Sequence, residues 1–338
     1  MRVLIHYQPN SNRDAFEGDR LRKTLKGECE SMGIEWVDSR YSKPDIAHFV
    51  SDKDLGLMRR MKAKGVKTVV SAFYCERDLD ARMLIADPKG QFFLRPKAKK
   101  MLNEADAVLV PSIPLKKFCE KNGIKSKIFV SHPSVNPDRF VLSDIESVLF
   151  LRYFGVSKER KFVLITGNFY ETKKLRTLLS LAKKMPKMRF YFLGYAPRYA
   201  ELLVRHYKNK APKNLKISRV LSDDVYRSAM KHASAYLMLS KLPDAAGMME
   251  AFSAKTPVIA LGNQDLNPLL INGVSGRIAK KEDALLQFLE EIYEGEGKET
   301  THASFAIAKK NSIERSGAFL QSVYNLLLSE KKEAKSHD

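Results

Sequence analysis

Short apolar runs alternate with longer amphipathic stretches through the first half of the chain. The runs are rich in β-branched and aromatic residues, which is typical of buried strands, and the stretches between them carry apolar residues at helical spacing. The expected strands are RVLIHY, IEWVD, DIAHFV, KTVVSAF, AVLVPS and KIFVSH, and the expected helices lie near residues 14–32, 53–64, 76–105 and 114–122. This alternation predicts a parallel sheet covered by helices.

The same alternation restarts in the second half. The expected strands are KFVLITG, MRFYFLG, LKIS, AYLMLS and PVIAL, with helices near residues 172–184, 197–208, 222–233, 245–254, 281–294 and 301–329. Residues 132–160, between the halves, contain prolines and few periodic apolar positions, which is typical of a connection between domains.

These patterns predict an α/β protein with two facing, doubly wound, Rossmann-like domains. The expected domains are residues 1–145 and 146–310, and residues 311–338 form a closing helix and a charged tail. Ligands of open α/β sheets bind at the carboxyl ends of the strands. The function is therefore expected in a cleft between the two domains.

Length and composition agree with this picture. A chain of 338 residues with 44% hydrophobic residues can build two cores. No apolar run is long enough for a signal peptide or a membrane span, so a cytoplasmic location is expected. Cys29, Cys75 and Cys119 lie far apart, without a C-x-x-C pair or nearby histidines. They are expected to be buried, reduced thiols, and no metal site is expected.

The charge balance changes the picture more. Lysine and arginine number 59 against 39 for aspartate and glutamate, a net charge of +20. Such an excess favours an acidic partner, namely nucleic acid, an anionic membrane or a phosphorylated substrate; the alternative is that it only aids solubility. The cations gather at residues 53–65, 92–102 and 114–127. The final SEKKEAKSHD has no apolar face and is predicted to be a frayed tail.

Two basic segments have the composition of helices that lie in a membrane surface. Leu57, Met58 and Met61 share one face of the expected helix 53–64, and FFLRPKAKKML combines two phenylalanines with four cations. The alternative is the ordinary outer helix of an α/β domain. The residues expected to face a membrane are Arg59, Arg60, Lys62, Phe92, Phe93, Arg95, Lys97, Lys99 and Lys100.

A single carboxylate, Glu250, stands among small and apolar residues in DAAGMMEAFSAKTPVIALG, residues 244–262. Residues 245–254 favour a helix, and the PVIAL that follows favours a strand. An acid that faces such a junction is costly to bury unless something pairs with it.

Several segments resemble, in order and spacing, family 4 of the glycosyltransferases, which are retaining enzymes of the GT-B fold. LITGNFYETKKLRTLLSLAKKM, FYFLGYAPRYAELL, MLSKLPDAAGMMEAFSAKTPVIA and INGVSGRI resemble the nucleotide-sugar-binding half. In the first half, VSHPSVNPDRF resembles the family's strand-to-linker motif, and PDIAHF and KTVVSAF resemble its central strands. The resemblance covers nearly the whole chain.

The family carries two glutamates separated by seven residues, and the second corresponds to Glu250. The resemblance implies that this carboxylate accepts hydrogen bonds from the two ribose hydroxyls of the nucleotide; the alternative is a surface glutamate of a helix. Gly247, Met248 and Met249 precede it at the helix start, where the diphosphate is expected to approach backbone N–H groups. A small residue at 247 keeps that approach open.

Lys173 aligns with the family lysine that neutralises the diphosphate, and Lys174 is placed to assist it. A departing nucleoside diphosphate gathers negative charge, so a cation aimed at it lowers the barrier. The alternative is a solvated lysine at a helix start, where the helix dipole disfavours positive charge. Gly167 keeps the same loop clear, and Asn168 stands where the family often has arginine.

Gly18, in DAFEGDRLRKTL, corresponds to the family's glycine loop near the donor phosphate and the acceptor. A loop with a helix cap explains it nearly as well. The first family glutamate falls on Leu242, and Asp244 is the nearest acid that could reach the donor sugar. The alternative is that Asp244 only caps the helix. Lys173 and Asp244 are thus the expected catalytic residues.

The family histidine that follows the strand KTVVSAF is missing, because residues 72–74 are Ala-Phe-Tyr. His48 and His132 lie on other strands and are expected to be packing or hydrogen-bonding residues. The resemblance implies front-face attack in which the leaving phosphate takes the acceptor's proton, without a cofactor or metal.

The basic first half is similar to that of the family's bacterial glycolipid synthases. The expected partners are therefore a UDP-hexose and a diacylglycerol or glycosyldiacylglycerol acceptor, with the protein attached peripherally to the inner face of the cell membrane. Two alternatives stay open: a transferase for a cell-surface, protein-linked or lipid-linked glycan, and a degenerate, non-catalytic binding protein. No nucleic-acid partner is expected, since no recognition motif accompanies the charge.

Overall fold

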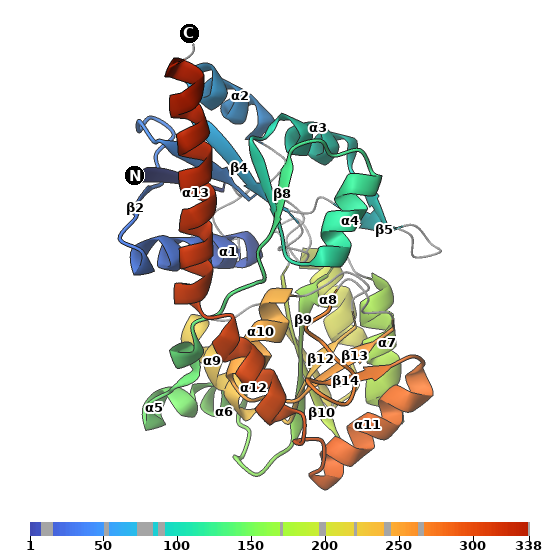
Figure 1. Ribbon diagram of the computed structural model, residues 1–338. Helices are drawn as coiled ribbons and strands as arrows, with labels where there is room; N and C mark the ends of the chain where they lie inside the picture. The colour runs from blue at the N-terminus through green and yellow to red at the C-terminus, as the bar shows by residue number, and fades with distance from the viewer. Residues whose placement is uncertain are drawn as a thin grey trace. The chain divides into compact units, whose positions relative to one another are not determined.

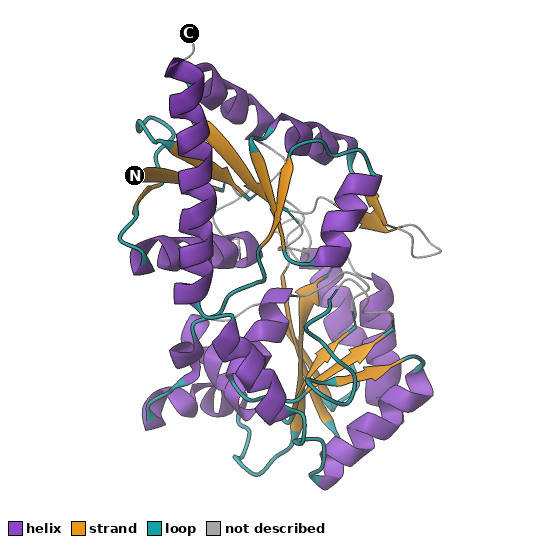
Figure 2. Cartoon of the chain, viewed as in Figure 1, coloured by secondary structure: helices purple, strands orange, loops and turns teal. Residues whose placement is uncertain are grey.

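The chain forms two compact units in the computed structural model (Figure 1). The structure describes residues 1–7, 16–50, 54–72, 84–86, 92–169, 172–195, 201–219, 222–239, 245–262 and 267–336. The first unit comprises Met1–Ser134 with Asn311–Asp338, and the second comprises Val135–Lys310. Each unit is built around a six-stranded parallel sheet with helices on its faces (Figure 2).

The sheet of the first unit has the strand order β2-β1-β3-β4-β7-β8. Its strands are β1 (Arg2–His6), β2 (Glu35–Val37), β3 (Ile46–Phe49), β4 (Lys67–Ser71), β7 (Ala107–Val110) and β8 (Lys127–Val130). The helices of this unit are α1 (Phe16–Ser31), α2 (Leu55–Ala63), α3 (Pro96–Glu104), α4 (Ile113–Lys121) and α13 (Ile313–Ser336). Every residue of β3 and β7 is buried, as expected for parallel strands covered on both faces.

One part of the first unit differs from the sequence prediction. Helices and no strands were expected within residues 76–105, whereas β5 (Leu84–Ala86) and β6 (Phe92–Leu94) form an antiparallel pair within this range. Among the described residues of this range, α3 is the only helix. Phe-Phe-Leu favours a strand, and Pro96 at the first turn of α3 favours a helix start directly after it.

The sheet of the second unit has the strand order β11-β10-β9-β12-β13-β14. Its strands are β9 (Phe162–Asn168), β10 (Arg189–Tyr195), β11 (Leu215–Arg219), β12 (Ala235–Met238), β13 (Val258–Leu261) and β14 (Arg277–Ala279). The larger helices of this unit are α7 (Thr172–Lys184), α8 (Glu201–Lys210), α9 (Asp223–His232), α10 (Ala245–Ser253), α11 (Glu282–Glu294) and α12 (Thr301–Lys310). The predicted order of elements is confirmed, and β14 is an addition to it.

The expected connection at residues 132–160 largely belongs to the second unit. It contains the 3-10 helix η2 (Pro137–Phe140) and the short helices α5 (Asp144–Ser147) and α6 (Leu149–Phe154). Phe140 and Phe150 are buried in the same core cluster as Tyr191 of β10. The second unit therefore begins at Val135 rather than at residue 146.

The C-terminal helix α13 returns to the first unit and packs along α1. Leu320, Val323 and Tyr324 are buried with the strands of that sheet. A side chain at Gly317 would lie 2.6 Å from the carbonyl oxygen of Glu28, so only glycine permits this close approach of the two helices. The helix continues to Ser336, so the frayed tail predicted from residue 329 is wrong. Lysine, glutamate and alanine are good helix formers once the preceding turns are packed.

A buried acid lies where α1 meets the last residue of Met1–Ser134. Glu28 is 5% exposed and accepts a hydrogen bond of 2.5 Å from the Ser134 hydroxyl and another from the Ser316 hydroxyl. Burial raises the pKa of Glu28 from 4.5 to about 7, although both hydroxyls act against that shift. This carboxyl therefore takes up a proton near neutral pH.

Glu28→Gln is expected to stabilise the first unit at pH 8 and to leave its stability nearly unchanged at pH 4.5. The folded-state pKa lies above the unfolded one, so the folded unit holds a proton that it loses as the pH rises through about 7, at a cost of about 3 kcal/mol. Glutamine does not titrate and avoids that loss. Urea unfolding followed by the fluorescence of Trp36, the single tryptophan, measures the difference.

The matched control is Glu120→Gln, on the exposed side of α4 in the same unit. It is expected to change stability by the same small amount at both pH values. A Glu28→Gln variant whose stability relative to wild type does not depend on pH would contradict the raised pKa.

Candidate functional site

The order of strands in the second unit marks a place where ligands bind. The chain runs outward from β9 through β10 to β11 and then returns to β12, which pairs with the other side of β9. The carboxyl ends of β9 and β12 are therefore adjacent at the point where the strand order reverses. In open α/β sheets this switch point is where ligands bind. Helix α7 follows β9, and helix α10 follows β12.

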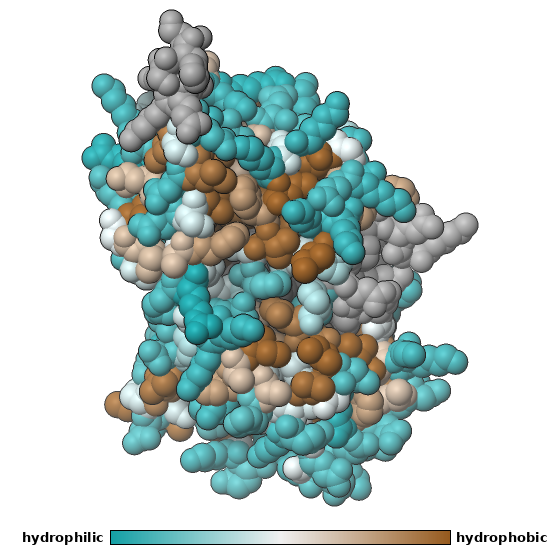
Figure 3. Space-filling model, viewed as in Figure 1, coloured by the Kyte–Doolittle hydropathy of each residue, from teal (hydrophilic) through white to brown (hydrophobic). Residues whose placement is uncertain are grey.

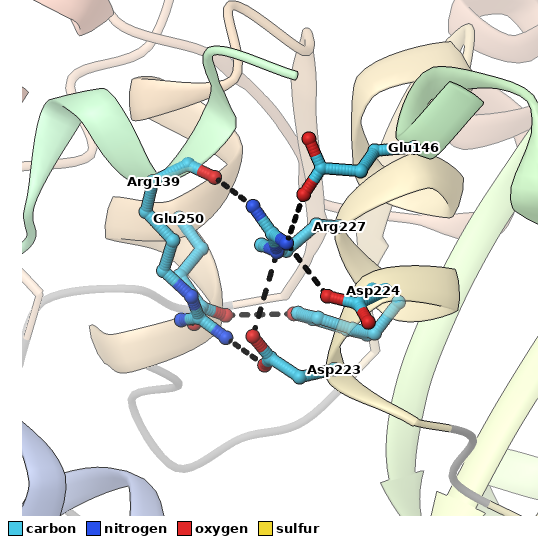
Figure 4. A network of polar contacts seen from close by, with 7 residues as sticks. Arg139, Glu146, Asp223, Asp224, Arg227 and Glu250 are labelled. Atoms are coloured by element: carbon cyan, nitrogen blue, oxygen red, sulfur yellow. Dashed lines mark hydrogen bonds and ion pairs between the residues drawn. The ribbon is translucent and has the colours of Figure 1, made fainter. Parts of the chain in front are cut away.

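Glu250 lies on α10 and is the best-defined polar group at this edge (Figure 4). It is 4% exposed, and its two oxygens have different partners. Arg139 of η2 donates to Oε1, and the Tyr226 hydroxyl of α9 donates to Oε2 over 2.7 Å. These bonds offset the cost of burying a carboxylate. The sequence indicated that an acid at this junction needs a partner, and Arg139 and Tyr226 supply it, whereas the predicted contact with a ribose stays a prediction.

A second set of contacts holds Arg139 in place. Its other terminal nitrogen pairs with Asp223 at the start of α9. Arg227, one turn further along α9, donates to the backbone carbonyl of Arg139 over 3.0 Å and also pairs with Glu146 (2.8 Å) and Asp224 (2.6 Å). Figure 4 shows this network joining η2, α5, α9 and α10.

Glu146 is fixed from its own helix as well. It forms a capping box with Ser143 at the start of α5. The backbone N–H and hydroxyl of Ser143, together with Arg227, lower the pKa of Glu146 to about 2. The carboxylate therefore stays ionised at neutral pH and keeps its contacts with Ser143 and Arg227.

Sequence reasoning missed Arg139 and Tyr226. The motif VSHPSVNPDRF had drawn attention to the segment that contains Arg139, but nothing in that motif showed where the guanidinium would point. Tyr226 stands on a helix predicted from periodicity alone, with no further signal.

The methionines before Glu250 lie differently from the expectation. Met248 and Met249 are fully buried in the core cluster of the second unit, and Asn267 contacts the Met248 sulfur at 3.1 Å. A nucleotide could therefore meet only the backbone of these two residues. Gly247 is also buried, in the first turn of α10. Its predicted contact with a diphosphate through the backbone stays a prediction.

The residues expected after β9 lie at the same switch point. Gly167 is inside β9, opposite Gly194 of β10, and Asn168 ends the strand. Lys173 and Lys174 occupy the first turn of α7. Lys173 is exposed, whereas Lys174 is 6% exposed. An exposed amine is the one that a diphosphate can approach, so the placement agrees with the role predicted for Lys173 without testing it.

Three further positions were considered in the sequence, namely Asp244, Gly18 and His48. Asp244 falls outside the described residues, and Gly18 lies in the first turn of α1. His48 is fully buried between the Tyr324 hydroxyl (2.6 Å) and the Ser71 hydroxyl (2.7 Å), and burial lowers the pKa of His48 to about 3. These two contacts confirm its predicted hydrogen-bonding role, and the lowered pKa keeps the ring neutral at physiological pH.

His132 contacts the carbonyl of Pro111 through Nδ1 at 3.0 Å, so its predicted hydrogen-bonding role is also confirmed. Cys29 and Cys119 are buried, free thiols, as predicted, and Cys75 lies outside the described residues. In the part of the chain that the structure describes, no cluster of three or more histidine, cysteine or acidic side chains could hold a metal ion.

The prediction that the apolar face of helix 53–64 enters a membrane is wrong. Leu57, Met58 and Met61 of α2 are buried against the first unit, so they are not available to enter a membrane. Arg59 forms two hydrogen bonds with Glu104 and lowers the pKa of that carboxyl. Lys62 donates to the backbone carbonyl of Glu104 at 2.5 Å. Arg60 is exposed.

The cations predicted at residues 92–102 lie on the surface of α3 and just before it. Lys97, Lys99 and Lys100 are exposed, Arg95 is half-buried, and Phe93 is 48% exposed. The side chain of Phe92 lies outside the description. Among the described residues, no helix has the length and apolar character to cross a bilayer.

Comparison with known proteins agrees with these observations. Residues 152–310 match the family model described as "Glycosyl transferases group 1". Over 336 residues, 98% of this chain and 100% of the relative, the sequence is 20% identical to the processive diacylglycerol alpha-glucosyltransferase of Acholeplasma laidlawii.

Solved structures share the fold. HepE from Anabaena in complex with UDP and glucose superposes with a TM-score of 0.72 at 13% identity, covering 96% of this chain and 99% of HepE. A glycosyltransferase from Rickettsia africae gives a TM-score of 0.68 at 15% identity, covering 97% and 98%. At these identities the likeness shows the fold alone, and this fold is GT-B.

Proposed function

We propose that this chain, whose residues 152–310 carry the group 1 glycosyl transferase domain, moves a hexose from a UDP-sugar to a membrane lipid with retention of configuration. The observation that carries the proposal is Glu250, an oriented carboxylate at the switch point of that domain. The acceptor is diacylglycerol or a glycosyldiacylglycerol.

The donor side of the proposal rests on the chemistry of the site. A carboxylate with both oxygens fixed can accept hydrogen bonds from the two hydroxyls of a ribose. Lys173 at the start of α7 supplies positive charge for a diphosphate. HepE, which shares the fold, is described in complexes with UDP and with UDP-glucose, and this supports uracil as the base of the donor nucleotide.

The reaction exchanges one bond at the anomeric carbon. The bond from that carbon to the UDP phosphate oxygen breaks, and a bond to the acceptor hydroxyl oxygen forms on the same face of the sugar. The acceptor's proton passes to the leaving phosphate, so no enzyme base is required. Lys173 stabilises the charge that develops on the diphosphate, and Asp244 contacts the hydroxyls of the donor sugar.

The acceptor side rests on the relative from Acholeplasma laidlawii and on the basic surface of the first unit. The ends of α3 and α4 are joined by Asn103, which donates to the Gly123 carbonyl over 3.2 Å and accepts from the Lys125 backbone over 2.7 Å. The exposed lysines of the two helices therefore belong to one surface.

An apolar groove opens beside these lysines. It has a volume of about 590 Å³ and lies between α4, the edge strand β8 and α13. Ile113, Ile128 and Phe319 contribute apolar side chains, and Lys116 and Lys117 stand at its border. Figure 3 shows apolar side chains gathered over β8 and beside α4. Ile113 is 57% exposed, which suits contact with lipid chains.

We propose that this surface, the lysines of α3 and α4 with the groove beside them, docks on an anionic phospholipid bilayer. Cations bind anionic headgroups, and each contributes on the order of 1 kcal/mol near such a surface. Exposed apolar side chains add to that attraction by entering the headgroup boundary. The sequence alone had assigned this role to α2 and to residues 92–102, so the proposed surface keeps the lysines of α3 and has α4 and the groove in place of α2.

Reversing two charges on this surface is expected to weaken binding to anionic vesicles at least tenfold. The variant is Lys116→Glu/Lys117→Glu, and co-sedimentation with phosphatidylglycerol vesicles at low ionic strength measures it. The matched control is Lys208→Glu/Lys210→Glu at the exposed end of α8 in the second unit, with the same change in net charge. An equal loss of vesicle binding in both variants would show that only net charge matters, and it would contradict docking by this surface.

A second candidate function is a non-catalytic binding protein. The observation that favours it is Leu242, which stands where the family has its first glutamate. Such a protein would bind UDP without consuming a UDP-sugar, and donor hydrolysis separates the two candidates.

A further inference from the structure

The carboxylate of Glu250 is held on both sides by residues of its own unit. Arg139 reaches Oε1 from η2, and Tyr226 reaches Oε2 from α9, so the two contacts come from different elements. A glutamate side chain has several rotatable bonds, and two such contacts restrict it to one orientation. A side chain that the protein already holds in one orientation loses less conformational entropy when it binds a ligand.

The two donors also decide which oxygen lone pairs are in use. Each carboxylate oxygen can accept two hydrogen bonds, and the donors Arg139 and Tyr226 fix one direction on each oxygen. A vicinal diol presents two hydroxyl donors at a fixed spacing. A carboxylate whose plane is fixed can match that spacing better than one that rotates.

Arg139 is itself oriented by its surroundings. Asp223 pairs with its second terminal nitrogen, and Arg227 donates to its backbone carbonyl. Its side chain is 25% exposed, and that of Glu250 is 5% exposed, so the pair is partly shielded from water. The contact between them is a charge-assisted hydrogen bond, which is stronger than a neutral one.

We infer that Arg139 is a positioning residue that, together with Tyr226, fixes Glu250 for the ribose diol and so sets the preference for a ribonucleotide over a deoxyribonucleotide. This inference rests on the proposed function, because it takes Glu250 as the ribose contact. Arg139 does not contact the nucleotide in this account. It acts through the orientation of the carboxylate.

The test compares UDP with 2′-deoxy-UDP in calorimetric binding measurements on the full chain. Wild type is expected to bind UDP at least tenfold more tightly, because the deoxy compound lacks one donor to a charged acceptor. In Arg139→Ala this ratio is expected to fall below threefold, chiefly through weaker binding of UDP. Arg139→Lys keeps the charge and is expected to recover an intermediate ratio.

The matched control is Arg277→Ala, which removes a partly buried arginine of the same unit that pairs with two carboxylates, Glu291 and Glu299, outside this network. It is expected to lower the melting temperature but to keep the wild-type ratio. Tyr226→Phe preserves the ring and removes only the hydroxyl, so it tests the second contact in a variant that keeps its packing. A lower ratio is expected there as well.

Two failures can be told apart. If wild type does not distinguish UDP from 2′-deoxy-UDP, or if Glu250→Ala leaves the ratio unchanged, the ribose assignment of the proposed function is wrong. If Glu250 controls the ratio but Arg139→Ala and Tyr226→Phe, both folded, keep it at the wild-type value, the inference about their positioning role is overturned.

Discussion

Glu250→Ala is expected to raise the dissociation constant for UDP more than tenfold and to reduce sugar transfer by at least as much. The substitution removes an acceptor for two ribose hydroxyls, and hydrogen bonds to a charged group contribute about 1.5–3 kcal/mol each. The loss should appear in donor binding, and in transfer below saturating donor, rather than in turnover at saturation, because the ribose is held alike in the ground state and the transition state.

The controls for this variant address folding. Alanine at position 250 leaves Arg139 and Tyr226 without their shared acceptor, so some loss of stability is expected. Glu250→Gln keeps the shape of the side chain and should weaken UDP binding with a smaller loss. Glu290→Ala, an exposed residue of α11, should change neither property. An unchanged dissociation constant in folded Glu250→Ala would remove the ribose assignment.

Lys173→Ala is expected to lower turnover by about a hundredfold or more, with a smaller effect on UDP-sugar binding. The reason is that negative charge gathers on the diphosphate as the bond to the sugar breaks, so the cation is worth more in the transition state than before it. Steady-state transfer kinetics at saturating donor measure this effect directly.

The matched control is Lys183→Ala, an exposed lysine in the last turn of the same helix. It removes the same charge at the end of α7 remote from the switch point and is expected to retain wild-type turnover. Wild-type turnover in Lys173→Ala itself would refute the role in departure of the diphosphate. The burial of Lys174 makes it a poor substitute, because a folded unit would have to expose it first.

Much of the architecture could be predicted from hydrophobic patterning. The strands of parallel sheets are buried on both faces, so they appear as short continuous apolar runs, and β3, β7 and β12 are buried along their whole length. The helices between these strands show apolar residues at clear helical spacing. Prediction failed at β5 and β6, because these apolar runs of three residues are short and the strands pair with each other outside the main sheet.

The acidic residue of the site could be predicted from the sequence, but its hydrogen-bond partners could not. Glu250 attracts attention because a carboxylate among small apolar residues needs a partner. Arg139 is 111 positions away in the chain, and its contact depends on how η2 packs against α9 and α10. Local periodicity carries no information about such a contact, because the contact depends on packing of the core that contains Phe140.

The same reasoning explains the change in the expected docking surface. Periodicity correctly placed Leu57, Met58 and Met61 on one face of a helix, but a face that covers a sheet and a face that enters a membrane have the same pattern. Burial in the structure separates the two cases. The exposed lysines and Ile113 of α4 then become the stronger candidates for contact with lipid.

The most direct test of the account is transfer of radiolabelled hexose from UDP-glucose and UDP-galactose into lipid extracted with organic solvent. The vesicles contain phosphatidylglycerol with diacylglycerol or monoglucosyldiacylglycerol, and Glu250→Ala is assayed beside wild type. The account predicts label in the lipid fraction with wild type and at least tenfold less with the variant. No label in lipid from either donor, with UDP binding that wild type shows and the variant loses, would contradict a lipid glycosyltransferase.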